Sequence, residues 1–161
     1  MIVTIVQHLV NQLNVSGVTY EFGLGARFWA NLLEDEHDFV ANKGIVYLDQ
    51  PITTDYQLTA GGFIGEFYPI TLFFMLKSEL DWLPEEHEVN CIEPANNAVR
   101  QFISLCQNAN ELINEVSDPS ALEFYNLLDV NVSGKSLTIK LKPRIYPGVC
   151  TPAIPPLPPT P

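Results

Sequence analysis

The chain has 161 residues, a length at which one domain forms around a single core. Apolar residues make up 47% of it, which excludes disorder of the whole chain, and a formal charge of −11 argues against a surface that binds nucleic acid through its phosphates. Charged residues make up only 17%, against about 25% in an average soluble domain. This composition predicts apolar surface that a partner covers.

The charge is distributed unevenly along the chain. Residues 1–134 hold four basic and all nineteen acidic side chains, a net charge of −15, whereas residues 135–161 hold four basic and no acidic side chains. An acidic body and a basic strip can dock head to tail between copies, which is the geometry that closes into rings. The alternative is that the strip is the solvated face of a strand. Its members are Lys135, Lys140, Lys142 and Arg144.

The three cysteines, Cys91, Cys106 and Cys150, cannot all pair within one chain and do not have the spacing of metal ligands. A disulfide framework is therefore not expected. The first twenty residues carry no charge, but polar residues interrupt them and no basic segment precedes them, so we expect no signal peptide. No apolar run approaches the roughly 18 residues of a membrane-spanning helix. We expect an intracellular protein at synthesis, with no membrane partner.

The N-terminal region predicts a helix and then a short strand. Residues 2–14 place apolar side chains at helical spacing, although their β-branched residues leave a strand at positions 2–6 as the alternative. Residues 18–22 alternate with a period of two, which predicts a strand. The Gly-Leu-Gly run at residues 23–25 resembles half of a dinucleotide-binding fingerprint. Phe28 stands where the third glycine belongs, so we expect no nucleotide site.

Two β-rich runs in the middle of the chain, residues 44–49 and 70–80, predict an antiparallel pair of strands inside a sheet. Residues 53–65 between them are rich in turn residues and too long for a tight hairpin, which predicts a projecting loop that forms an interface or has another function. Residues 72–76 are apolar on both faces. This suits a strand covered on one side by a helix and on the other by a further layer or subunit.

The clearest predicted element is an amphipathic helix. Apolar residues recur at steps of three and four from Ala95 to Val116 and leave amide side chains on the opposite face, and Pro94 fits the first turn. Asp118 and Pro119 then predict the start of a second, shorter helix that ends near Tyr125.

The C-terminal part predicts a hairpin followed by an arm. Residues 126–142 alternate on both sides of Ser133-Gly134, the predicted turn. Eight of the thirteen prolines lie in residues 143–161, which predicts an extended, polyproline-like arm. Together these elements predict a single α+β domain over residues 1–142. In this domain an antiparallel sheet packs against one long amphipathic helix and an N-terminal helix.

Two acidic clusters are the candidates for chemistry. Residues 34–38 and 85–88 each combine carboxylates with an imidazole, that of His37 or His87. Consecutive residues point in different directions, and neither spacing is that of a zinc hydrolase helix, so solvated acidic turns are the favoured interpretation. A small metal-dependent hydrolase using either histidine is a further hypothesis. Cys106 lies in the buried stripe of the long helix, where a thiol is inert. We expect no catalytic residue, no metal and no cofactor.

The order of these elements resembles that of the tail-completion or tail-terminator class of neck proteins in tailed bacteriophages. The resemblance is one of layout over residues 1–142, carried by the N-terminal helix, the strands at 44–49 and 70–80, the helix from Ala95 to Val116 and the strand at 137–141. It implies a non-enzymatic virion protein, present in the host cytoplasm during assembly, that forms a homo-oligomeric ring at the neck or tail. The additional hairpin and the proline-rich arm depart from that class.

The resemblance also implies the partners. They are copies of the chain, neighbouring neck or tail proteins, and double-stranded DNA that passes through without specific binding, because an acidic channel face repels phosphates. The alternative function is a monomeric adaptor that binds a partner through residues 152–158. Trp82 is either a lid over the edge of the core or an anchor in a subunit contact. The candidate interface residues are Tyr56, Phe63, Trp82, Lys135, Lys140, Lys142, Arg144, Pro152, Pro155, Pro156 and Pro158.

Overall fold

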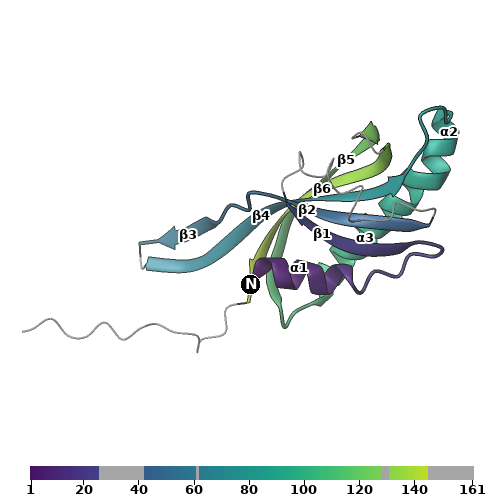
Figure 1. Ribbon diagram of the computed structural model, residues 1–161. Helices are drawn as coiled ribbons and strands as arrows, with labels where there is room; N and C mark the ends of the chain where they lie inside the picture. The colour runs from purple at the N-terminus through teal and green to yellow at the C-terminus, as the bar shows by residue number, and fades with distance from the viewer. Residues whose placement is uncertain (26–41, 61, 128–130, 145–161) are drawn as a thin grey trace, which may run out of the picture.

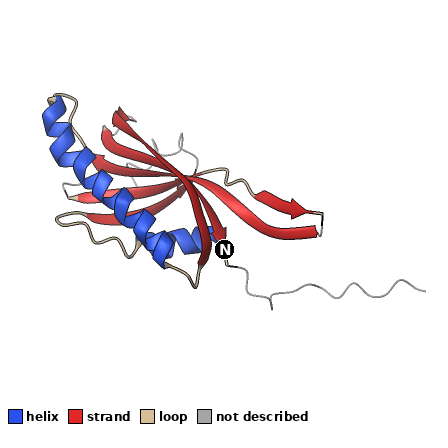
Figure 2. Cartoon of the chain, turned by 180° about the vertical axis from the view of Figure 1, so that it is seen from behind, coloured by secondary structure: helices blue, strands red, loops and turns tan. Residues whose placement is uncertain are grey.

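The computed structural model describes residues 1–25, 42–60, 62–127 and 131–144. In this part of the chain a mixed sheet of six strands carries its helices on one face (Figures 1 and 2). The elements are α1 (Ile2–Val10), β1 (Thr19–Gly25), β2 (Lys43–Asp49), β3 (Asp55–Thr59), β4 (Gly62–Lys77), α2 (Pro84–His87), the π-helix η2 (Glu88–Ile92), α3 (Glu93–Asn108), β5 (Ile113–Leu127) and β6 (Val132–Pro143). The α+β class predicted from the sequence is confirmed.

The sheet has the strand order β1-β2-β4-β6-β5, and β3 pairs with β4 outside this path. Strands β2 and β4 are antiparallel, with Gly44 opposite Leu76, so the predicted central pair is confirmed. Strands β1 and β2 are parallel, and the expectation of an entirely antiparallel sheet was therefore wrong. Alternation along a strand shows which face is buried but not in which direction a neighbouring strand runs.

β4 is the longest strand, with 16 residues and three partners. Its first part pairs with β3 and its second part with β6 and β2. The loop predicted at residues 53–65 is thus a β-hairpin in its larger part, which corrects the prediction. The alternating Tyr56, Leu58 and Phe63 favour strands more than the neighbouring turn residues oppose them.

The N-terminal helix is present as predicted, whereas the long helix has different ends from those predicted. Helix α1 is present, and the alternative strand at positions 2–6 is absent from the described residues. The long helix occupies Pro84 to Asn108 as the consecutive segments α2, η2 and α3, so the predicted span from Ala95 to Val116 began too late and ended too late. The apolar residues at its predicted end belong to β5, where Ile113 is buried opposite Pro143 of β6.

Two turn signals near the C-terminus lie inside strands. Asp118 and Pro119 are part of the edge strand β5 and do not start a helix. The β5–β6 register shifts between Ser117 and Ser120, and Asp118 has a positive φ of 52°, a combination typical of a bulge that accommodates proline. Ser133-Gly134 lies within β6 and is not the turn. The predicted second strand, residues 137–141, lies in β6, but the antiparallel partners of β6 are β5 and β4 and not the predicted first strand at residues 128–132, so the hairpin prediction was correct only in its second half.

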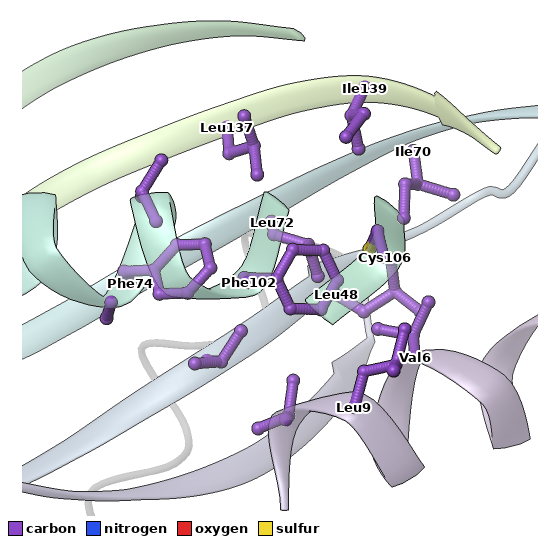
Figure 3. Packing of buried hydrophobic residues seen from close by; sticks show 14 of the residues in the cluster. Val6, Leu9, Leu48, Ile70, Leu72, Phe74, Phe102, Cys106, Leu137 and Ile139 are labelled. Atoms are coloured by element: carbon purple, nitrogen blue, oxygen red, sulfur yellow. The ribbon is translucent and has the colours of Figure 1, made fainter. Parts of the chain in front are cut away.

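The main core lies between the sheet and the helices. Val6 and Leu9 of α1 and Phe102 and Cys106 of α3 meet Leu72 and other residues of the central strands (Figure 3). The rings of Phe74 and Phe102 meet edge to face with centroids 6.0 Å apart. These buried apolar side chains supply the largest share of the stabilisation in such a layered fold.

A second, smaller core lies on the other face of the sheet. Phe73 and Met75 alternate with Leu72, Phe74 and Leu76 along β4 and are buried with Ile45, Tyr47 and Val132. The prediction that residues 72–76 are covered on both faces is confirmed. The double coverage explains why β4 is apolar at every position in this stretch.

We predict that Gly134→Ala severely destabilises the fold. Gly134 lies opposite Met75 in the β4–β6 pair, and a Cβ atom there would meet the backbone carbonyl oxygen of Phe74. Because backbone in the centre of the sheet cannot move without breaking strand pairing, the free energy of unfolding should fall by about 3 kcal/mol or more. Urea denaturation followed by circular dichroism measures this loss. Ser136→Ala on the same strand is the control, and equal midpoints for the two variants would contradict the prediction.

Candidate functional site

A β-hairpin projects from the sheet and is the most prominent surface feature of the described chain (Figures 1 and 2). We define the hairpin as β3 together with residues 62–67 of β4. All five residues of β3 are exposed, including Tyr56 at 65% and Leu58 at 70%. Phe63 lies opposite Leu58 in the strand register. The hairpin thus brings the predicted interface positions 56 and 63 to one projecting element.

Contacts at its base attach the hairpin to the body. Lys142 of β6 donates from Nζ to Oε1 of Gln57 at 3.2 Å, and the same ammonium lies 4.9 Å from the ring centroid of Phe67. Tyr68 donates its hydroxyl to Glu66 at 2.7 Å. These bonds link β6 to both strands of the hairpin, so its direction relative to the sheet is held by side chains as well as by the continuous backbone of β4.

The basic strip is largely engaged within the chain. Lys135 lies 3.2 Å from Glu123 and donates to Asn96 at 3.1 Å, and its side chain is only 14% exposed. Lys140 lies 3.7 Å from Asp118. The exposed pair of Lys140 and Asp118 contributes little to stability, but both ion pairs reduce the positive charge offered to a partner. Arg144 is exposed, and its backbone N–H donates to Leu112 at 2.9 Å. The proline positions of the interface prediction lie outside the described residues.

Figures 1 and 2 show α2 at the end of the molecule opposite the hairpin. Leu80, Leu83 and Val89, at or near α2, are between 62% and 71% exposed. We call these three residues the far patch. Five exposed carboxylates surround it in the sequence: Glu79, Asp81, Glu85, Glu86 and Glu88. Sequence reasoning missed this apolar patch, because scattered leucines between acidic residues resemble a solvated turn.

His87 belongs to a buried polar network and not to a solvated acidic turn, which corrects that interpretation. Its Nδ1 lies 3.2 Å from Oγ of Ser133, and both side chains are buried. Its ring meets those of Trp82 and Tyr125 edge to face, with centroids 5.5 and 5.8 Å away. Trp82 therefore covers the buried imidazole, an arrangement that matches the lid interpretation. The cluster at residues 34–38 lies outside the described residues.

The pair of His87 and Ser133 has the composition of a catalytic dyad but not its geometry. Ser133 donates its hydroxyl proton to Ser78 at 3.0 Å and accepts the backbone N–H of Asn126 at 3.0 Å. Because the serine proton is directed to Ser78, the hydroxyl does not present it to the imidazole, as catalysis by a general base would require. The serine side chain is also fully buried. The network therefore joins α2, β5 and β6 to Ser78, the residue that follows β4, and is shielded from solvent.

The other polar groups in the core are also unsuited to chemistry. Burial raises the pKa of the Cys91 thiol to about 11 and that of Cys106 to about 12, so both stay protonated near neutral pH. Burial likewise raises the pKa of Tyr20, whose hydroxyl has no hydrogen-bond partner among the described residues. In the described part of the chain no three His, Cys, Asp or Glu side chains come together as a metal site.

A depression of about 540 Å³ lies between residues 14–16 and the helical segment that contains η2 and α3. Amides line it, including Asn97 and Gln101, together with the exposed Val89. None of its lining side chains is buried, so it has no preorganised polar group for a small ligand. Val89 connects it to the far patch.

No known protein family matches this chain, and no relative is found among the curated proteins. No helix in the described ranges is long and apolar enough to cross a membrane. The exposed surfaces of the described chain are therefore the remaining guide to its function.

We predict that Ser133→Ala lowers the free energy of unfolding by about 2 kcal/mol, because it leaves His87 and the Asn126 N–H without their buried partner. The same Ser136→Ala variant is a matched control, because that hydroxyl makes one exposed bond, to Leu122 at 3.4 Å, and its loss should cost little. Urea titrations of both variants measure the difference. A fully stable Ser133→Ala protein would contradict a structural role for the network.

Proposed function

We propose that the chain is a non-enzymatic structural subunit that assembles with copies of itself into a ring at the head-tail neck or tail of a phage-like particle. The observation that carries the proposal is the projecting hairpin with Tyr56 and Leu58 exposed. A two-stranded hairpin is marginal in water by itself, and burying such side chains against a partner releases about 25 cal/mol per Å² of apolar surface. An exposed apolar hairpin on a body with its own core is typical of a subunit.

The proposed particle, and the proposed location within it, are based on the resemblance of the element order in the sequence to that of tail-completion and tail-terminator proteins. A net charge of −15 over residues 1–134 suits a ring whose channel face repels passing DNA. The proposed location is the virion, with the host cytoplasm during assembly. Pro143 belongs to β6, so the arm was predicted to begin too early. The proline-rich segment that follows β6 would run along a neighbouring subunit, because a polyproline conformation makes no internal hydrogen bonds and leaves its carbonyls available.

The mass of the assembled protein tests the proposal. We predict that native mass spectrometry and light scattering of the full chain at micromolar concentration give a closed oligomer, a fixed integer multiple of 18.0 kDa. A ring has one defined copy number, because its last interface closes. A stable monomer at that concentration, with no partner protein that induces assembly, would contradict the proposed function.

The second candidate function is a monomeric adaptor, which is favoured by the eight prolines in residues 143–161. Removal of residues 146–161 distinguishes the adaptor from the ring subunit. We predict that the truncated chain keeps its circular dichroism spectrum and urea midpoint but dissociates at a concentration at least about tenfold higher, because each interface loses the contacts of one arm. Analytical ultracentrifugation measures the change. A full chain and a truncated chain that are both monomeric would favour the adaptor.

A further inference from the structure

The exposed apolar side chains are concentrated at two opposite ends of the molecule. Of the nine large apolar side chains exposed in the described residues, two are Tyr56 and Leu58 on the hairpin and three form the far patch. Figures 1 and 2 show the hairpin and α2 at opposite ends of the long axis in both views. Each surface therefore faces away from the other and cannot be covered by it within one chain.

We propose that the hairpin of one copy docks on the far patch of the next copy. This inference rests on the proposed function and names the two surfaces that would form its interface. Because the surfaces are different and lie at opposite ends, each contact leaves one hairpin and one far patch unused. Such heterologous contacts continue from copy to copy until a ring closes.

The charges of the two surfaces fit this arrangement. Residues 56–63 of the hairpin carry no charge, so they can enter the acidic surroundings of the far patch without repulsion. The exposed Arg144 follows β6, whose Lys142 contacts the hairpin base, and these residues bring positive charge behind the uncharged segment. Residues 78–92 contain five carboxylates and no lysine or arginine. Asp55 and Glu66 also lie at the base of the hairpin, so the base carries both signs, and the match with the acidic far patch comes from the uncharged outer segment.

The shapes also fit. The five residues of β3 extend over about 17 Å at roughly 3.3 Å per residue, enough to reach across a subunit boundary. Val89 of the far patch borders the depression lined by Asn97 and Gln101. This hollow can accept side chains from the outer segment of the hairpin, residues 56–63, whose polar members Gln57 and Thr59 are uncharged. A second copy of the chain is the proposed occupant of the far patch, because every copy carries the hairpin that would dock there.

Complementation between two variants tests the contact. Leu58→Glu places a carboxylate on the hairpin, against the acidic far end. Leu83→Asp places one in the far patch and is compatible with folding, because Leu83 is the N-cap of α2 and aspartate is a preferred N-cap residue. We predict that each variant alone is monomeric, whereas a 1:1 mixture forms a heterodimer that grows no further. The intact far patch of Leu58→Glu then binds the intact hairpin of Leu83→Asp.

Leu122→Glu is the matched control, because Leu122 is a 71% exposed leucine on β5 that belongs to neither surface, and the assembly of this variant should equal that of the wild type. Leu58→Thr, which retains β propensity, serves if glutamate unfolds the hairpin; circular dichroism checks the fold of each variant. Variants that assemble like the wild type would overturn the docking contact and leave the ring standing. Monomeric variants whose mixture stays monomeric would also overturn it, whereas a monomeric wild type would overturn the ring as well.

Discussion

The backbone pairing of β4 is the constraint on which the rest of the structure depends. One continuous strand pairs with β3 over its first residues and with β2 and β6 over its last ones. The buried half is anchored by apolar side chains on both faces, Leu72 and Phe74 toward the helices and Phe73 and Met75 toward the second cluster. Because β4 is continuous, the pairing and packing that fix its buried half also stabilise the hairpin built on its first half.

In this arrangement the buried residues that stabilise the fold are different from the exposed residues proposed to bind another copy. The hairpin needs no core of its own, since β4 and the bonds of Lys142 hold it. Its outer residues are therefore free to differ in character from the body, and they are apolar and uncharged. The far end shows the same separation, because the buried network of His87 and Ser133 secures the start of the long helix while Leu80, Leu83 and Val89 stay exposed above it.

Periodic patterns in the sequence correctly predicted the helices and strands that bury the same face, or both faces, along their whole length. The helix at Ile2–Val10, the antiparallel pair of β2 and β4, and the double coverage of residues 72–76 all follow from one repeated pattern. Prediction failed where a local signal competed with distant partners. Ile113 and Val116 suit a helical stripe as well as a strand, and pairing with β6 selected the strand. Asp118-Pro119 and Ser133-Gly134 are typical of helix starts and turns, yet both lie inside paired strands.

The sequence by itself determined that residues 56–63 carry no charge, that residues 78–92 are acidic, and that charged residues make up only 17% of the chain. Only the tertiary structure decided that the first two segments lie at opposite ends, that Lys135 and Lys140 meet carboxylates of their own chain, and that His87 is buried. The physical reason is that composition and periodicity are local properties. The neighbours of a side chain are chosen by strand pairing and packing between residues that lie far apart in the sequence.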